Sequence, residues 1–303
     1  MAISRAQLAK ELEPGLNALF GLEYGRYENE HSEIFDEESS DRAFEEEVML
    51  GGFSTAPSKG EGTAISFDEA RETYTARYTH ETIALAFSIT EEAIEDNLYD
   101  RLASRYTKAL ARSMAQTKQI KAAAILNNAF LAGANAIGDG VALCSNAHPS
   151  LSGNQTNLLA TAADLNETSL EQMLIDIAGL TDERGLKIAV RGTKLIIPKE
   201  LQFIAERVLN SNLRSGTADN DNNAMKNMGM LPEGAVVNHF LTDTDAYFIK
   251  TDAPNGFKYF NRAAIKTAME GDFDTGNMRF KARERYSFGV SDWRSVFATP
   301  GAA

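Results

Sequence analysis

The chain has 303 residues, of which 43% are hydrophobic, and a formal net charge of -13. No apolar run approaches the roughly 18 residues that a membrane-spanning helix needs, so we expect no membrane partner. The acidic excess lies in residues 1–72, with 17 acidic against 6 basic residues, while the remainder is nearly neutral. Because a free nucleic-acid-binding protein usually presents a basic surface, this balance argues against sequence-specific DNA binding.

The start of the chain predicts no export. The sequence MAISRAQLAKELEPG lacks both the apolar core and the cleavage site of a signal peptide. Cys144 is the only cysteine, so no internal disulfide can form, as is usual in a reducing compartment. We therefore expect a folded protein that stays in the cytoplasm where it is made.

Residues 1–47 combine a helical pattern over 5–20 with an acidic run over 28–47. The acidic run has too few apolar residues to build a core of its own, and composition alone also fits a solvated disordered tail. Four aromatic residues favour docking instead, namely Tyr24, Tyr27, Phe35 and Phe44. We expect an arm that lies on another surface.

Residues 48–89 have the character of a long hairpin. A loop rich in Gly, Pro and Ser over 50–62 precedes strand-like segments at 63–67 and 73–89. Such a hairpin would project from the body, and its unpaired edges would seek a neighbouring chain.

Residues 90–130 contain neither proline nor glycine and predict a single long helix. Thr90 can cap its start, where acidic residues gather, and basic residues lie towards its end, as the helix dipole favours. At 1.5 Å per residue the helix would be roughly 60 Å long. Four basic residues fall opposite its apolar face, namely Arg101, Arg105, Lys108 and Arg112.

The region from residue 164 onward alternates helical and strand patterns. Helices are predicted from 164, with Thr168 and Glu171 as a capping box, and over 199–211. Strands are predicted over 186–190, 193–198, 235–241, 246–250 and 257–260. Asn255-Gly256 is a strong turn signal and predicts a hairpin between the last two strands.

The segment 278–290 predicts a strand with one basic and one mostly apolar face. Its basic residues are Arg279, Lys281, Arg283 and Arg285. A solvated face is the default interpretation of this stripe and of the helical one. The alternatives are an acidic arm such as residues 28–47 as the partner of the helix, and DNA phosphates as the partner of the strand.

No motif predicts a cofactor or a metal. Gly133 and Gly138 have the spacing of a phosphate loop without its lysine, and the run 219–223 lacks the glycine and glutamate of a calcium loop. Cys144 and His148 suggest a cysteine or zinc site, but the other histidines fall in unrelated segments. We expect no enzyme, and a Cys/His-dependent hydrolase remains the remote alternative.

The order of arm, projecting hairpin, long helix, α/β lobe and returning strand resembles the tailed-bacteriophage major capsid protein of the Hong Kong 97 type. Five stretches, which span almost the whole chain in order, resemble the Mu-like group of major head subunits. They are FDEESSDRAFEEEVMLGGF, ITEEAIEDNLYDRLASRYTKALARSMAQTK, LIIPKELQFIAERVL, FLTDTDAYFIKTDAPNG and FDTGNMRFKARERYSFGVSDWR.

This resemblance implies an α+β fold divided into an N-terminal arm, an extended loop, a peripheral domain with a spine helix, an axial domain and a C-terminal peripheral strand. The corresponding ranges are 1–47, 48–89, 90–163, 164–260 and 261–303. It implies hexamers and pentamers of an icosahedral virion shell that encloses double-stranded DNA and assembles in the bacterial host cytoplasm. A protein nanocompartment shell is the alternative with the same fold.

The resemblance also implies a portal protein as a partner. Because the arm begins within a few residues of Met1, we expect scaffolding to come from a separate protein. The expected assembly contacts are the acidic residues Glu37, Glu38, Glu45 and Glu46, with Lys59 on the extended loop and the basic stripe Arg101, Arg105, Lys108 and Arg112. The expected DNA-facing residues are Arg279, Lys281, Arg283 and Arg285.

Overall fold

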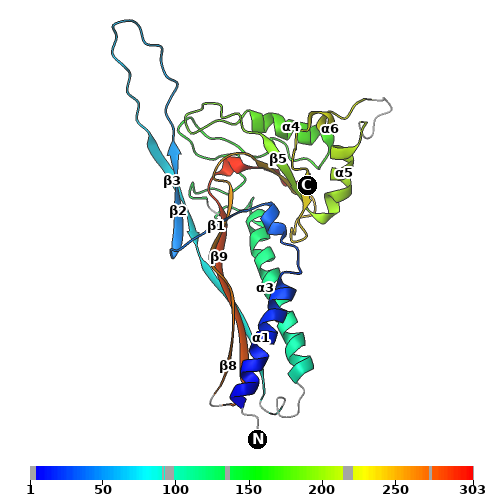
Figure 1. Cartoon of the computed structure of the whole chain (residues 1–303). Helices are drawn as coiled ribbons and strands as arrows, with labels where there is room; N and C mark the ends of the chain where they lie inside the picture. Colours follow the sequence, from blue (N-terminus) through cyan, green and yellow to red (C-terminus); the bar gives the residue numbers. More distant parts are fainter. Residues whose placement is uncertain are drawn as a thin grey trace.

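The computed structural model describes residues 5–90, 92, 99–133, 137–213, 221–272 and 275–302, with backbone alone at 5–12 and 99–102. Figure 1 shows an elongated slab of helices and long strands, a rounded lobe at one end and a hairpin that projects beyond both. No helix in the described ranges is long and apolar enough to cross a bilayer.

The arm docks on its own chain. Helix α1, Arg5–Tyr24, runs beside α3, and Leu16 and Phe20 are buried there with Leu110 and Met114. The short helix η1, Glu30–Glu33, and strand β1, Asp36–Ser39, follow. Of the four aromatic residues expected to dock, Phe35 is buried in the main core and Tyr24 stacks on Phe20, whereas Tyr27 and Phe44 are exposed.

The projecting hairpin consists of β2, Phe44–Gly51, and β3, Arg71–Thr79, paired antiparallel. The strand expected over 63–67 is absent, because residues 52–70 form a loop without strand structure. Strand β4, Glu81–Ile89, leaves the hairpin and pairs with β9 instead. Up to His80 the even-numbered residues such as Tyr78 are buried, and after it the odd-numbered residues such as Ile83 face inward. The chain passes there from one sheet to another.

The long sheet has the strand order β1-β8-β9-β4, with β8, Phe257–Gly271, and β9, Met278–Val290, as its central strands. Helix α3, Tyr99–Asn127, packs on one face. Its 29 described residues correspond to about 43 Å, and the predicted start over residues 91 and 93–98 lies outside the described part. The helix ends three residues before the predicted end at Phe130, and the side chain of its last residue, Asn127, bonds the backbone of Phe240 and Thr242.

The short sheet forms the lobe and has the order β10-β7-β5-β6. Its strands are β5, Gly192–Ile197, β6, Ala235–Val237, β7, Tyr247–Thr251, and β10, Val296–Thr299. The helical elements of this region are α4, Glu167–Ala178, η2, Lys199–Leu201, α5, Gln202–Asn210, α6, Ala224–Met228, and η3, Trp293–Ser295. Together with β8 and β9, the buried residues of the lobe supply most of the main core.

Three predictions for this region were wrong. Residues 186–190 form no strand, only an isolated bridge from Lys187 to Thr181. Helix α4 is capped by Asn166 with Ser169, two residues earlier than the Thr168 and Glu171 pattern. Asn255 does adopt the left-handed turn, at φ 58°, but the strands on its two sides belong to different sheets.

The structure also places the end of the chain differently from the expected segments. Strand β10 returns to the short sheet rather than staying in the slab. Two expected domain boundaries, after residues 47 and 260, fall inside β2 and β8. Strands β2 and β8 therefore run without interruption across the boundaries expected from the sequence.

Candidate assembly and nucleic-acid surfaces

Three lysines, one from each of three strands, hold the acidic arm against the body. Lys194 of β5 lies with its Nζ 3.0 Å from Glu33 and 3.1 Å from Glu233. Desolvation lowers the pKa of Lys194, but hydrogen bonds to these two carboxylates outweigh it and the net pKa is raised. The arm thus neutralises a largely buried cation.

The other two lysines continue this contact along the arm. Lys250 of β7 donates to the carbonyl oxygen of Ile34 at 2.8 Å and lies 3.3 Å from Asp36. Lys258 of β8 pairs with Glu38 at 3.1 Å and with Glu47 at the root of the hairpin. The arm and the projecting hairpin are therefore tied to the same strand.

A second ion pair joins α1, α3 and the long sheet. Lys118 Nζ of α3 lies 2.7 Å from Glu284 of β9, and the Tyr24 hydroxyl donates to the same carboxylate at 3.1 Å. The rings of Tyr24, Tyr259 and Tyr286 surround the ammonium group at 5.2 to 5.8 Å. Glu284 interrupts the apolar face of β9 because it is the counterion of this buried lysine.

The acidic residues expected as assembly contacts have partners within the chain. Glu37 accepts from Asn261 at 3.2 Å, Glu45 accepts from Ser40 at 2.7 Å, and Glu46 lies 3.7 Å from Arg77. Within the described part of the chain, neither these residues nor Glu38 pair with the basic stripe on α3. An arm of the same chain is therefore not what covers that stripe.

The helical stripe is accessible. Arg105, Lys108 and Arg112 are exposed and form no ion pair with any side chain that the structure describes. Arg101 lies on the same helix, where only its backbone is described. Tyr106 and Ile120 of α3 are also about half exposed, at 49% and 51%, but they lie off the stripe, and Tyr106 packs against Phe87 of β4. The stripe itself is a row of cations.

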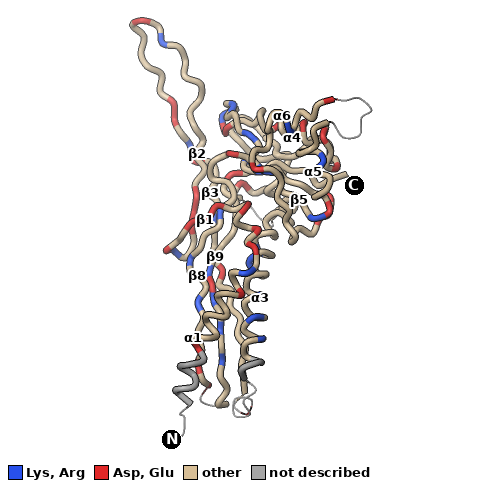
Figure 2. Tube along the Cα trace, turned by 45° about the vertical axis from the view of Figure 1, so that its right-hand side comes forward, with Lys and Arg blue, Asp and Glu red and all other residues tan. Residues whose placement is uncertain are grey.

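The strand stripe lies on the opposite side of the slab. Phe280, Ala282 and Glu284 of β9 face α3, so Arg279, Lys281 and Arg283 point away from it and are exposed. Arg285 is half-buried and Arg279 pairs with Asp272 at 2.5 Å. Figure 2 shows cations both along α3 and along these strands.

The neighbours of the strand stripe are small on β4 and mixed on β8. On β4 the residues opposite Lys281 and Arg283 are Ala86 and Ala84. On β8 the residues opposite Arg279, Lys281 and Arg283 are Glu270, Ala268 and Lys266. Alternate residues of a strand are about 6.8 Å apart, so the cations form an evenly spaced row on a shallow surface. Such a row can contact a line of phosphates without reading sequence.

The loop 52–70 exposes large apolar side chains, namely Phe53, Ile65 and Phe67, the last of them 96% exposed. Arg184 lies 3.6 Å from Asp68 and donates to the carbonyl oxygen of Glu69 at 2.6 Å, which ties the loop to the lobe. Lys59 lies on the same loop and is exposed. The contacts with Arg184 fix the base of the loop against the lobe, while the apolar side chains of the loop stay exposed to solvent.

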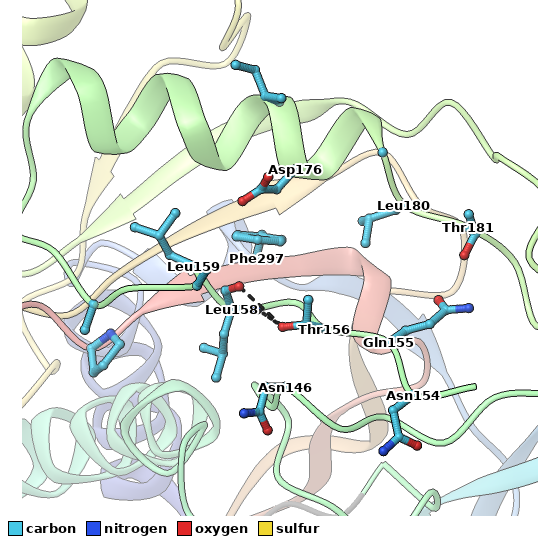
Figure 3. A pocket seen from close by; sticks show the side chains of 15 residues that line it. Asn146, Asn154, Gln155, Thr156, Leu158, Leu159, Asp176, Leu180, Thr181 and Phe297 are labelled. Carbon is cyan, nitrogen blue, oxygen red and sulfur yellow. Dashed lines mark hydrogen bonds between the residues drawn. The ribbon is translucent and has the colours of Figure 1, made fainter. Parts of the chain in front are cut away.

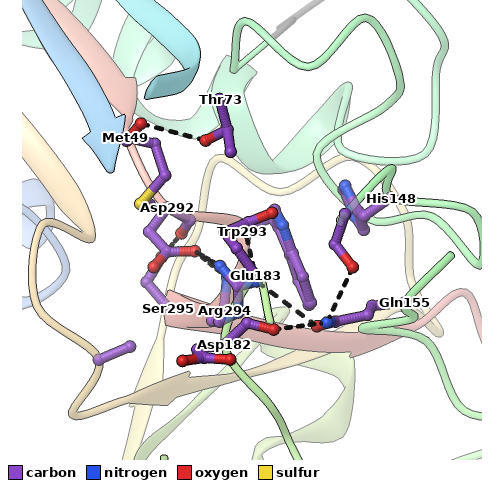
Figure 4. Close-up of polar contacts among 12 residues, drawn as sticks. Met49, Thr73, His148, Gln155, Asp182, Glu183, Asp292, Trp293, Arg294 and Ser295 are labelled. Carbon is purple, nitrogen blue, oxygen red and sulfur yellow. Dashed lines mark hydrogen bonds and ion pairs between the residues drawn. The ribbon is translucent and has the colours of Figure 1, made fainter. Parts of the chain in front are cut away.

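A buried arginine organises the joint between the loops and the end of the chain (Figure 4). Arg294 lies 2.8 Å from Glu183 and 3.3 Å from Asp292, and donates to the carbonyl oxygen of Thr181 at 2.7 Å. Its guanidinium also stacks 4.3 Å from the Trp293 ring. Burial raises the pKa of Asp292, against the opposing effect of Arg294. No local sequence pattern marks these residues as partners.

His148 and Cys144 do not form a catalytic pair. His148 Nδ1 lies 2.6 Å from Asp139, and Nε2 lies 3.1 Å from Asn157 Oδ1. The Asn157 amide donates to three carbonyl oxygens, including that of Leu143, so its Oδ1 must accept from His148. Burial raises the pKa of Cys144, which keeps the thiol protonated. Both ring nitrogens are therefore occupied, and the nucleophile is inactive.

A groove of about 860 Å³ lies between α4 and the loop 146–162 (Figure 3). Leu158, Leu159 and Phe297 line it, and Asp176 is the only charged side chain among its described lining residues. No group of three metal-ligating side chains occurs in the described ranges. The groove offers apolar contact rather than acid–base chemistry.

The comparisons agree with this geometry. Residues 73–299 match the phage capsid protein family. No curated protein is detectably similar in sequence. A chain from Mycobacterium phage Adephagia aligns over 91% of each chain with a TM-score of 0.55 at 12% identity. The capsid of Myoviridae phage XM1 aligns over 89% of each chain, with a TM-score of 0.53 at 13% identity.

A virus-like particle from Pyrococcus furiosus also aligns, over 94% of this chain and 97% of that chain, with a TM-score of 0.50 at 9% identity. At such identities the structural likeness establishes the fold, while the family match covers most of the chain. The chain therefore belongs to the phage capsid protein family, and it is a major capsid protein of a tailed phage with the Hong Kong 97-type α+β fold.

Proposed function

We propose that many copies of this protein associate into hexamers and pentamers, which close into an icosahedral shell around double-stranded DNA in the cytoplasm of a bacterial host. The observation that carries the proposal is the projecting loop 52–70, whose exposed apolar side chains have no partner surface on the lobe or slab. Each contact between subunits can be weak, because closure of a shell multiplies it.

The helical stripe is the proposed protein contact. Arg105, Lys108 and Arg112, with Arg101 on the same helix, would meet acidic residues of a neighbouring subunit. The candidate partners are Glu37, Glu38, Glu45 and Glu46, with Lys59 making a further contact on the loop. Hydrophobic contacts supply most of the affinity in this scheme, and the charges set the register.

The strand stripe is the proposed DNA contact. Arg279, Lys281, Arg283 and Arg285 are flanked by small residues on β4 and by small or charged residues on β8 rather than by large apolar groups, which favours phosphates over a protein surface. We also propose a portal protein as an assembly partner, as the resemblance to the family implies, and a scaffolding protein as a second one.

The first experiment is size-exclusion chromatography followed by negative-stain electron microscopy, at low and high salt, with and without a scaffolding partner. Closed shells, tubes or five- and six-membered rings are the expected result, and fewer of them at high salt. A species that stays monomeric under all conditions would contradict the proposal. Shells that hold enzyme rather than DNA would instead identify a nanocompartment.

Two matched triple variants separate the two stripes. Arg105→Gln/Lys108→Gln/Arg112→Gln should reduce assembly and its salt dependence, while Arg279→Gln/Lys281→Gln/Arg283→Gln should leave assembly intact and lower the amount of DNA retained per shell. Each variant removes three exposed charges, so folding stability serves as a common control. The opposite pattern would exchange the two assignments.

A further inference from the structure

The arm contains a buried histidine, His31, that lies near Lys118 of α3. We name residues 28–39 the strap. The backbone N–H of His31 donates to Gln119 Oε1 at 3.1 Å, and Gln119 Nε2 donates to the carbonyl oxygen of Glu28 at 3.2 Å. The His31 ring is buried, with its centroid 5.4 Å from the Tyr259 ring and 5.6 Å from the Phe288 ring.

The His31 ring is suited to the neutral state alone. Its Nδ1 atom is buried without a hydrogen-bond partner among the described atoms. Burial lowers the pKa of His31, with Lys118 of α3 acting in the same direction and the Gln119 hydrogen bond and Glu37 of β1 acting against it. Tyr259 of β8 and Phe288 of β9 contribute no counterion, and Glu284 is already occupied by Lys118.

We propose that the strap is an acid-released latch, in which protonation of His31 loosens the arm from α3 and the long sheet. Release would uncover Lys194, Lys250 and Lys258 and free the edge of β8 where β1 pairs. The latch goes beyond the proposed assembly function, because it operates within one subunit and needs no shell.

The other charged groups of the strap are paired. The carboxylates of Glu33, Asp36 and Glu38 are held by Lys194, Lys250 and Lys258. His239 lies 2.8 Å from Glu30 and is exposed, and a variant separates its contribution from that of His31. His80 accepts or donates to Ser40 just beyond the strap, and its contribution must be separated by a variant.

Hydrogen exchange of the full-length protein tests the latch. Peptides that cover 28–39 are followed at pH 7.5 and pH 5.5, with exchange times scaled for the intrinsic rate. Because free histidine has a pKa of about 6.5, the opening equilibrium should rise up to about tenfold at pH 5.5. His239→Gln and His80→Asn should retain this response.

His31→Phe is the decisive variant, because it keeps an aromatic ring and the backbone hydrogen bond but cannot be protonated. In this variant the protection of the strap amides from hydrogen exchange should be the same at both pH values. His31→Gln repeats the test with a polar side chain. Equal protection of the unmodified protein at both pH values would overturn the latch. An acid response that persists in His31→Phe would overturn it as well.

Discussion

The imidazole of His148 lies face to face on the indole of Trp293, with ring centroids 4.5 Å apart and planes 4° apart. Asp139 and Asn157 occupy the two ring nitrogens, so the stacked ring is fixed in its plane as well. The stack joins a loop that follows α3 to the segment that precedes β10. The residues Asp139, His148 and Asn157, whose types also occur in catalytic sites, therefore have a structural role here and connect these two segments.

The Asp139–His148 pair should contribute strongly to stability. Asp139→Ala leaves the buried imidazole without its partner and should lower the free energy of unfolding by about 3 kcal/mol. Asp139→Asn should cost less, because an amide can donate to Nδ1 while still accepting from Val141. Urea unfolding measures both, with exposed Asp41→Asn as the control; equal losses for the two variants would contradict this account.

The Lys118–Glu284 pair should behave as a coupled unit. Lys118→Met strands a buried carboxylate and should cost about 3 to 5 kcal/mol of unfolding free energy. Adding Glu284→Gln removes that uncompensated charge, so the double variant should be more stable than Lys118→Met alone. A double-mutant cycle in urea gives the coupling, and additive losses would show that the two side chains act independently.

The unfolding free energy should fall with acid in part through His80. Burial lowers the pKa of His80, with Arg285 acting in the same direction, so the neutral ring is favoured in the folded state. Its stabilising effect is complete above the unfolded pKa of about 6.5 and is lost as the pH falls through the folded value. His80→Asn should be less sensitive between pH 7.5 and 5.5; an unchanged slope in urea titrations would argue against it.

The apolar tip of the projecting loop should matter for assembly alone. Phe67→Ser alters a side chain that is 96% exposed and should change the unfolding free energy by less than about 0.5 kcal/mol. The same change should lower the yield of shells, measured by sedimentation. Thr55→Ser, on the same loop, is the matched control, and wild-type assembly by Phe67→Ser would exclude the tip as a contact.

Gly138 should not tolerate a side chain. Its φ is 100°, and a Cβ atom there would lie 2.2 Å from the Thr75 carbonyl oxygen of β3. Gly133, with φ 80°, has open space around the same position. Gly133→Ala should therefore lower the free energy of unfolding by about 1 to 2 kcal/mol, the cost of a left-handed backbone for a residue with a side chain. Gly138→Ala should lower it clearly more, because the new Cβ atom also clashes. Similar melting temperatures for the two variants would refute the close approach.

Local periodicity predicted much of the fold. The helix over α3, the strand over β5 and the two-faced strand over β9 follow from residue patterns that a single element satisfies. Strand partners did not follow, because pairing is decided by contacts far along the chain. β4 pairs with β9 nearly two hundred residues later, and the turn at Asn255 joins two sheets rather than two paired strands.

The buried polar clusters were also beyond the sequence analysis. Arg294, Glu183 and Asp292 come from separate segments, and nothing local marks them as partners. A signal did exist for the three lysines beneath the arm. Lys194, Lys250 and Lys258 each stand within or beside an apolar strand pattern, and a lysine that is drawn into a core requires a carboxylate.

The two basic stripes lie on opposite faces of one slab, and only helix α3 and the long sheet separate them. A wall built from this slab would have cations on its inner and its outer side. Packaged DNA can neutralise only one of the two sets. The other set needs anions of its own, which in the proposed shell are carboxylates of a neighbouring subunit. Loss of a subunit from the wall would then uncover arginines and lysines that a polyanion in the medium, such as heparin, can reach.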